Sequence, residues 1–218
     1  MIIRKICTDD IPFCCEIYNY YIENTTFTFE ENPLSKEDFE RRVKRITEKF
    51  PYIVAEYNGK IIGYAYLDHY SERSAYRFTA DVSIYVDKDF HSLGAGRSLI
   101  EALEREARKT GIKNLISIIT EENQNSMNFH RKNGYYEKGH LEKVGFKFGK
   151  WLDVVIMQKR FDIKTPSSKG NIYGNKKSQN FRHRRNRKNL FRGKRIYARK
   201  RKSDSMGRFL SAERKNHR

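Results

Sequence analysis

Hydrophobic residues follow two periodicities along the first 160 residues of the 218-residue chain. Ile11, Cys14 and Ile17 share one face of a predicted helix, because apolar residues three or four positions apart lie on the same side of a helix. Shorter runs rich in Val, Ile, Tyr and Phe predict strands. The predicted strands cover residues 2–6, 52–57, 60–67, 77–86, 115–120, 135–141 and 154–160, and the predicted helices follow residues 8–10 and 35–38 and cover 96–109 and 126–132.

The boundaries of these elements carry residues that favour such boundaries. Ser35 offers a helix N-cap, and Gly111 ends the third predicted helix. Asn58 and Gly59 separate two strand-like runs and tolerate positive φ, which predicts a tight hairpin. Because helices interrupt the strands without regular alternation, the order predicts an α/β fold of the α+β type, with a mixed, mostly antiparallel sheet flanked by helices.

The net charge of +18 is concentrated in the last quarter of the chain. Residues 162–218 hold 20 of the 45 lysines and arginines and 3 of the 27 acidic residues, whereas residues 1–161 are close to neutral. The last quarter also lacks hydrophobic periodicity, and so polar a segment cannot bury enough apolar surface to offset the entropy of ordering it. We therefore predict a domain at 1–161 and a disordered basic tail at 162–218.

Basic runs in the tail, at residues 182–188 and 199–202, suit non-specific contact with nucleic acid. Cationic segments bind polyanions because the released counterions favour the complex. The alternative interpretation, which we favour, is a solvated extension without a role of its own.

The start of the chain and its cysteines predict a cytoplasmic protein without a membrane partner. Residues 1–5 become charged at once, unlike a signal peptide, and no run approaches the roughly 20 apolar residues of a membrane span. Cys7, Cys14 and Cys15 are odd in number and lack CxxC spacing, as expected in a reducing compartment.

The main chemical signal is a strand that runs through a Gly-containing turn into a helix. The strand ends at residues 82–86, and Gly94 and Gly96 open the helix. Amides at a helix N-terminus favour an anion, and glycine lets the backbone approach a pyrophosphate. Two glycines alone also fit an ordinary tight turn. The third glycine of a dinucleotide fingerprint and the GK[ST] of a Walker loop are both missing.

Further motifs give the chain a resemblance to a known family. His91-x-x-Gly94-x-Gly96 is similar to the pyrophosphate loop of the GCN5-related N-acetyltransferase (GNAT) superfamily, in which Arg or Gln usually comes first. More closely, the chain resembles the phosphinothricin/methionine sulfoximine N-acetyltransferase branch. The stretches that carry this likeness are residues 17–21, 63–66, 76–79, 83–86, Asn123 with Ser126 and His130, and residues 144–154. The resemblance implies a GNAT fold over 1–161, acetyl-CoA as co-substrate and no metal.

The chemistry that the resemblance implies is attack of an amine on the acetyl-CoA thioester. The amine must lose a proton, so a general base is useful. Asp81 stands where this branch typically has Glu, and we predict that it is the base. It could take the proton directly or through water, and an aspartate side chain, one methylene shorter than glutamate, favours the water relay. A surface or ion-paired carboxylate is the alternative. A strand amide, that of Tyr85 or Val86, would stabilise the developing oxyanion.

The resemblance also implies residues for the coenzyme and the acceptor. The backbone of Ile84, Tyr85 and Val86 would pair with the pantetheine arm, and Asn123 would add a contact, although it fits a helix N-cap equally well. The pyrophosphate residues would be Ser92, Leu93, Gly94, Ala95, Gly96 and Arg97. The acceptor residues would be Arg73, Tyr76, Arg77, Lys147 and Trp151, of which Arg73 also fits a solvated surface and Trp151 packing. His130 fits a packed or surface residue better than a base.

The sequence therefore predicts a homodimeric, acetyl-CoA-dependent N-acetyltransferase for an amino-acid-like amine of the phosphinothricin or methionine sulfoximine/sulfone type. Two alternatives remain open at this point. One is an enzyme that acetylates protein or peptide N-termini, and the other is a GNAT-fold module that binds nucleic acid through its basic tail.

Overall fold

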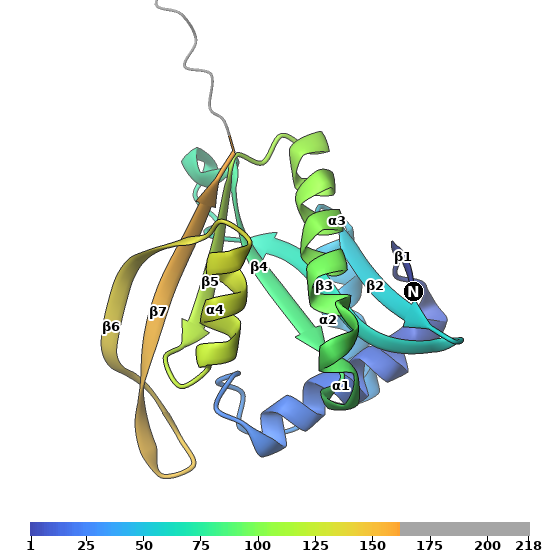
Figure 1. Cartoon of the computed structure of the whole chain (residues 1–218), viewed down its shortest axis with the longest axis horizontal. Helices are drawn as coiled ribbons and strands as arrows, with labels where there is room; N and C mark the ends of the chain where they lie inside the picture. Colours follow the sequence, from blue (N-terminus) through green and yellow to red (C-terminus); the bar gives the residue numbers. More distant parts are fainter. Residues whose placement is uncertain (162–218) are drawn as a thin grey trace, which may run out of the picture. The chain divides into compact units, whose positions relative to one another are not determined.

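The computed structural model describes residues 1–161 (Figure 1). The predicted basic tail at 162–218 lies outside the described residues. The helices are α1 (Ile11–Asn24), α2 (Lys36–Thr47), α3 (Ala95–Lys109) and α4 (Gln124–Lys132). The strands are β1 (Ile2–Lys5), β2 (Tyr52–Tyr57), β3 (Lys60–His69), β4 (Thr79–Val86), β5 (Asn114–Thr120), β6 (Tyr136–Lys147) and β7 (Lys150–Arg160). Helices and strands thus follow one another in the predicted order.

Within residues 1–161 the strands form one seven-stranded sheet in the order β1-β2-β3-β4-β5-β7-β6. Strands β4 and β5 run parallel to each other, and the other neighbours are antiparallel. This sheet, with helices on both faces, confirms the predicted fold class.

Two apolar clusters hold the helices on the sheet. Leu99 and Leu103 of α3 pack on one face, while Ile22 of α1 and Phe39 of α2 pack on the other. Strands β2 to β4 contribute to both clusters because successive side chains point to opposite faces. No helix within residues 1–161 is both long and apolar enough to cross a membrane.

Strands β4 and β5 separate after a short parallel stretch. They are in register at residues 79–81 of β4 and 114–116 of β5. Beyond that stretch β4 stays with β3 and β5 stays with β7, so their ends point apart (Figure 1). Among the described residues, the edge of β4 from Val82 to Val86 consequently has no strand beside it on the β5 side.

The β6–β7 hairpin is longer than the strands predicted at 135–141 and 154–160. The two strands meet at a turn formed by Phe148 and Gly149, both with positive φ. Charged residues after Leu141 interrupt the apolar alternation on which the prediction rested. The structure accommodates them in a bulge before Gly145, where the register shifts and Lys143 has a φ of 51°.

Candidate active site

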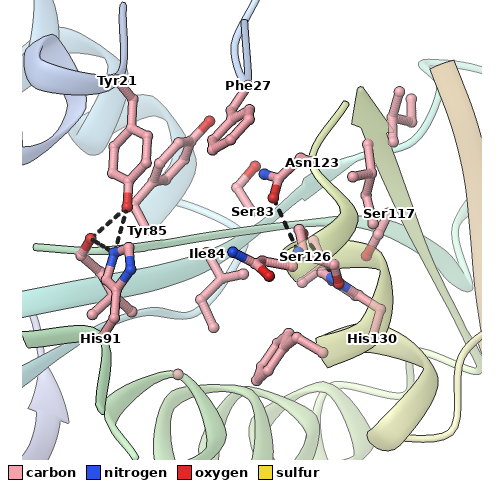
Figure 2. A pocket seen from close by; sticks show the side chains of 17 residues that line it. Tyr21, Phe27, Ser83, Ile84, Tyr85, His91, Ser117, Asn123, Ser126 and His130 are labelled. Atoms are coloured by element: carbon pink, nitrogen blue, oxygen red, sulfur yellow. Dashed lines mark hydrogen bonds between the residues drawn. The ribbon is translucent and has the colours of Figure 1, made fainter. Parts of the chain in front are cut away.

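A cavity of about 420 Å³ opens between the separated strands. Its walls come from residues 82–86 of β4, residues 117–119 of β5, the start of α3, helix α4, and Phe27 in the segment between α1 and α2 (Figure 2). Both apolar and polar side chains line it. A cavity of this size and lining is typical of a small-molecule site.

The open edge of β4 presents backbone groups to this cavity. The amide of Asp87 donates to the carbonyl of Ile62 on β3 at 2.8 Å. Residues of an antiparallel strand alternate between facing the partner and facing away. In the β3–β4 register, Tyr85 therefore faces β3, while Ile84 and Val86 face the cavity. An extended ligand can pair with these two residues as an added strand would.

This register changes the role predicted for Tyr85. Its amide points to Tyr64 on β3 and is turned away from an oxyanion in the cavity, whereas Val86, the other residue considered, has its amide on the open edge. The Tyr85 ring packs edge-on against Tyr18, with the ring centroids 5.1 Å apart. Burial raises the pKa of the Tyr85 phenol well above its ordinary value. Tyr85 thus contributes a cavity wall in the structure.

Tyr21 and His91 close the end of this edge. The Tyr21 hydroxyl donates to the Val86 carbonyl at 2.6 Å. Because that hydroxyl has a single proton, His91 Nε2 must be the donor in its own contacts, 3.0 Å from the Tyr21 oxygen and 3.2 Å from the Val86 oxygen. His91, which stands where the similar loop has Arg or Gln, is therefore turned back toward β4 (Figure 2).

The first turn of α3 reaches the cavity at Gly96. The residue before the helix, its N-cap, is Gly94, which has a φ of 75° and no side chain to bond the first amides. Free amides at a helix N-terminus favour an anion such as a pyrophosphate. The Arg97 guanidinium does not point to this anion site in the structure, because it pairs with exposed Glu101 one turn further along the helix.

Helix α4 forms the facing wall. Asn123 Oδ1 accepts the Ser126 amide at 3.0 Å, so Asn123 is the N-cap of α4, and it also lines the cavity. His130 is buried, and its Nδ1 donates to the Ser126 carbonyl at 2.8 Å. Its Nε2 is buried without a hydrogen-bond partner among the described residues. Burial lowers the pKa of His130, so the ring is neutral at pH 7.

Asp81 lies where β4 and β5 separate, next to the first cavity residue of β4. It is paired with Ile116 of β5 and faces Asp68 on β3. Its Oδ1 is buried and accepts no hydrogen bond from any residue that the structure describes. Burial, and then the charge of Asp68, raise the pKa of Asp81 to about 7. A carboxyl that titrates near neutral pH can both take up and release a proton.

The predicted acceptor residues between β3 and β4 lie outside the cavity wall. Arg73, Tyr76 and Arg77 are exposed. The Arg77 guanidinium lies over the Phe78 ring, 4.4 Å from its centroid. Arg77 also ends a short 3-10 turn, which is why β4 begins at Thr79 and not at 77 as predicted.

Lys147 and Trp151 also lie outside the cavity wall. Lys147 is buried, and its Nζ donates to the Thr28 carbonyl at 2.9 Å. Its ammonium therefore ties β6 to the segment between α1 and α2. Trp151 is 61% exposed and packs edge-on against Phe146 at 5.3 Å.

The predicted coenzyme residues divide into two groups. Those that line the cavity are Ile84, Tyr85, Val86, Gly96 and Asn123. Leu93, Gly94, Ala95 and Arg97 lie in the same loop and helix start but outside the wall, and the side chain of Ser92 is not described. Wall residues that the sequence did not single out include Phe27, Ser117 and Phe129, and Tyr21, although it lies in a stretch that carries the family likeness, was given no role. They come from elements far apart in the chain, so no local motif indicates that they line one cavity.

Known proteins share both this sequence pattern and this fold. The family described as an acetyltransferase (GNAT) domain matches residues 3–156. Phosphinothricin N-acetyltransferase of Alcaligenes faecalis is 37% identical over 159 residues, which cover 72% of this chain and 81% of that protein. L-methionine sulfoximine/L-methionine sulfone acetyltransferase of Pseudomonas paraeruginosa is 32% identical over 165 residues, 73% of this chain and 94% of that one. The crystal structure of a phosphinothricin acetyltransferase from Sinorhizobium meliloti in complex with acetyl-CoA is similar with a TM-score of 0.71 and 33% identity, over 73% of this chain and 87% of that chain.

Proposed function

Because the chain belongs to the GNAT acetyltransferase family and is an acetyl-CoA-dependent N-acetyltransferase, we propose that its acceptor is the primary amine of an amino-acid-like small molecule. The proposed class is that of phosphinothricin and methionine sulfoximine or sulfone, the compounds named for its relatives. The observation that carries the proposal is the cavity between β4 and β5, with an open backbone edge along one wall and Asp81 where the strands separate.

The proposed hold on acetyl-CoA uses mainly backbone groups. The backbone of Ile84 supports pairing with the amides of the pantetheine arm, because this residue faces the cavity. Val86 faces the cavity too, but its carbonyl already accepts from Tyr21, so its amide is the group that it offers to the acetyl end of the coenzyme. The uncapped first turn of α3, reached at Gly96, suits the pyrophosphate. Asn123, in the facing wall, supplies a further polar group.

The proposed chemistry begins with removal of a proton from the amine. An α-amine with a pKa near 8 is mostly protonated at pH 7. Asp81 would accept this proton through water, since it stands beside the cavity wall and its pKa is about 7. The neutral amine then attacks the thioester carbon, and the Val86 amide stabilises the charge that develops on the oxygen. The nitrogen that has attacked carries a positive charge and releases its second proton, the carbon–sulfur bond breaks, and the CoA thiolate takes up one proton, which leaves a neutral amide and free CoA.

We also propose that the enzyme is a homodimer that works in the cytoplasm. Large apolar side chains are exposed along the β6–β7 hairpin, and a patch of this kind supports an interface between copies. These side chains are Leu141, Val144, Phe146, Phe148 and Trp151. The cysteines are all free, which suits a reducing compartment. Sedimentation equilibrium of the full chain would test the dimer, and a mass of one chain at micromolar concentration would exclude it.

The acceptor is tested by measuring thiol release from acetyl-CoA by the full chain. The acceptors are phosphinothricin, methionine sulfoximine, methionine sulfone and a mixed peptide pool. We expect turnover with the amino-acid analogues, and turnover with peptides alone would instead indicate a protein N-terminus as acceptor.

The base is tested by Asp81→Asn, which we expect to lower kcat by about 10²–10⁴-fold without loss of acetyl-CoA binding. Asp89→Asn, at an exposed carboxyl, is the matched control. Unaltered turnover in Asp81→Asn would exclude Asp81 as the base.

A further inference from the structure

Two aspartates face each other across β3 and β4 beside the cavity. Asp68 is the direct cross-strand partner of Asp81. Side chains of such partners point to the same face, with Cβ atoms about 5 Å apart. Like charges in this position repel each other, and the repulsion is stronger where burial lowers the local dielectric. One of the two carboxyls must therefore take up a proton more readily than an ordinary aspartate.

An arginine from α2 determines which of the two stays charged. Arg45 donates two parallel hydrogen bonds to Asp68, Nη1 to Oδ1 at 3.0 Å and Nη2 to Oδ2 at 2.6 Å. Asp68 Oδ1 also accepts the His69 amide at 2.8 Å. Burial of Asp68 opposes its charge, but the bonds from Arg45 and from the His69 amide outweigh it and lower the pKa of Asp68. Asp68 is thus fixed as the anion.

The surroundings of Asp81 offer no comparable partner. On its own face, the neighbours one pair further along are Tyr66 on β3 and Ser83 on β4, and Ile116 lies across from it on β5. Helix α2 directs both Arg42 and Arg45 toward this face of the sheet, and their guanidinium groups are engaged with Glu30 and with Asp68. Within residues 1–161, no lysine or arginine forms an ion pair with Asp81.

We infer that Asp68, held by Arg45, is a positioning residue that places the exchangeable proton of the pair on Asp81. This inference rests on the proposed role of Asp81 as the base. The fixed anion on β3 raises the energy of the Asp81 carboxylate, and the guanidinium partly balances that field. The acidity of the base is therefore set by an ion pair outside the cavity, one strand away from the reacting groups.

The test is the pH profile of kcat/KM for the full chain between about pH 5 and pH 9, in wild type and two variants. Asp68→Asn keeps an oxygen that can accept from Arg45 and from the His69 amide but removes the charge. We expect its acidic limb to move down by about 1 pH unit, the scale on which a neighbouring charge shifts a carboxyl. Arg45→Gln removes the cation that balances the Asp68 charge, so we expect the acidic limb of this variant's profile to move to higher pH.

The matched control is Glu40→Gln, which breaks an exposed ion pair with Lys44 on the same helix and leaves the profile unchanged. If the two substitutions merely loosened the fold, the acidic limb would move in the same direction in both variants. The opposite signs in Asp68→Asn and Arg45→Gln therefore support the inference. Coincident profiles, or shifts in the same direction, would overturn it.

A second measurement follows the protonation of Asp81 directly and does not depend on enzyme activity. Carbon-13 NMR of aspartate-labelled full chain gives the titration of the Asp81 carboxyl, assigned by its loss in Asp81→Asn. If Asp81→Asn keeps full activity but the resonance titrates lower in Asp68→Asn, the proposed base is wrong and the placement of the proton is correct. If the titration of Asp81 is the same in wild type and Asp68→Asn, the inference is overturned whatever the activity.

Discussion

Replacing Asp81 with asparagine is expected to stabilise the fold at neutral and alkaline pH. In the folded chain, burial and the Asp68 charge raise the pKa of Asp81 to about 7, from an ordinary value of 3.8 that applies to the unfolded chain. The folded state therefore binds this proton more tightly than the unfolded state. The resulting stabilisation is fully present below about pH 4 and is lost as the pH rises through 7.

The size of the effect follows from the gap between the two pKa values. The gap is about three units, and each unit corresponds to about 1.4 kcal/mol, so ionisation of Asp81 lowers the free energy of unfolding by at most about 4 kcal/mol. The side chain keeps some contact with water, which screens its charge, and we expect about 2–3 kcal/mol. For a chain of this size, the asparagine variant should melt roughly 5–10 °C higher above pH 7.

Urea unfolding followed by circular dichroism at pH 4.5 and pH 8 measures this difference. Asp81→Asn should exceed wild type at pH 8, and the two should converge at pH 4.5. Asp89→Asn, at an exposed carboxyl, should stay within about 0.5 kcal/mol of wild type at both pH values. A variant no more stable than wild type at pH 8, or a gain of equal size at both pH values, would refute the assignment of a buried, proton-binding carboxyl at Asp81.

Substitutions at three further positions address packing, a helix cap and a buried hydrogen bond. Gly63→Ala should lower the free energy of unfolding in urea by about 1–3 kcal/mol, because the added methyl group would lie 2.8 Å from the backbone oxygen of Tyr85; an unchanged value would contradict this close approach. Asn123→Ala should lower it by about 1 kcal/mol through loss of the cap, whereas Asn123→Asp keeps the cap. A KM for acetyl-CoA that rises in both Asn123 variants would assign the side chain a coenzyme contact, and a rise in the alanine variant alone would attribute the effect to α4. Lys147→Met leaves the Thr28 carbonyl without its donor and should lower stability by about 1–3 kcal/mol with an unchanged KM for the amine; a raised KM at unchanged stability would contradict a structural role.

The order of helices and strands could be predicted because it depends on residues close together in the chain. Asn58 and Gly59 form the predicted hairpin turn with φ values of 50° and 75°. The Ser35 hydroxyl accepts the Asp38 amide at the start of α2, as its sequence context indicates. Gly94 has the positive φ that suits the turn before α3. In each case the chemistry of a few consecutive residues determines the local backbone.

The cavity walls could be predicted only in part, since they depend on packing between distant segments. Tyr21 reaches the Val86 carbonyl across 65 positions of the chain, and only the packing of α1 on the sheet brings the two together. The direction of the Tyr85 amide could not be predicted from the sequence either. A shift of one residue in the β3–β4 register would reverse which amides face the cavity, and long-range pairing fixes that register.

The narrow contact between β4 and β5 affects how the domain acquires activity as it folds. Strands β1 to β4 on one side, and β5 to β7 on the other, are each joined by antiparallel pairing. The two groups meet through three residues of each strand, which the whole of α3 separates in the chain. Closing such a long loop is slow compared with forming hairpins. Asp81 is one of those residues, so we expect catalytic competence to appear only when the two groups of strands join, after most of the secondary structure has formed.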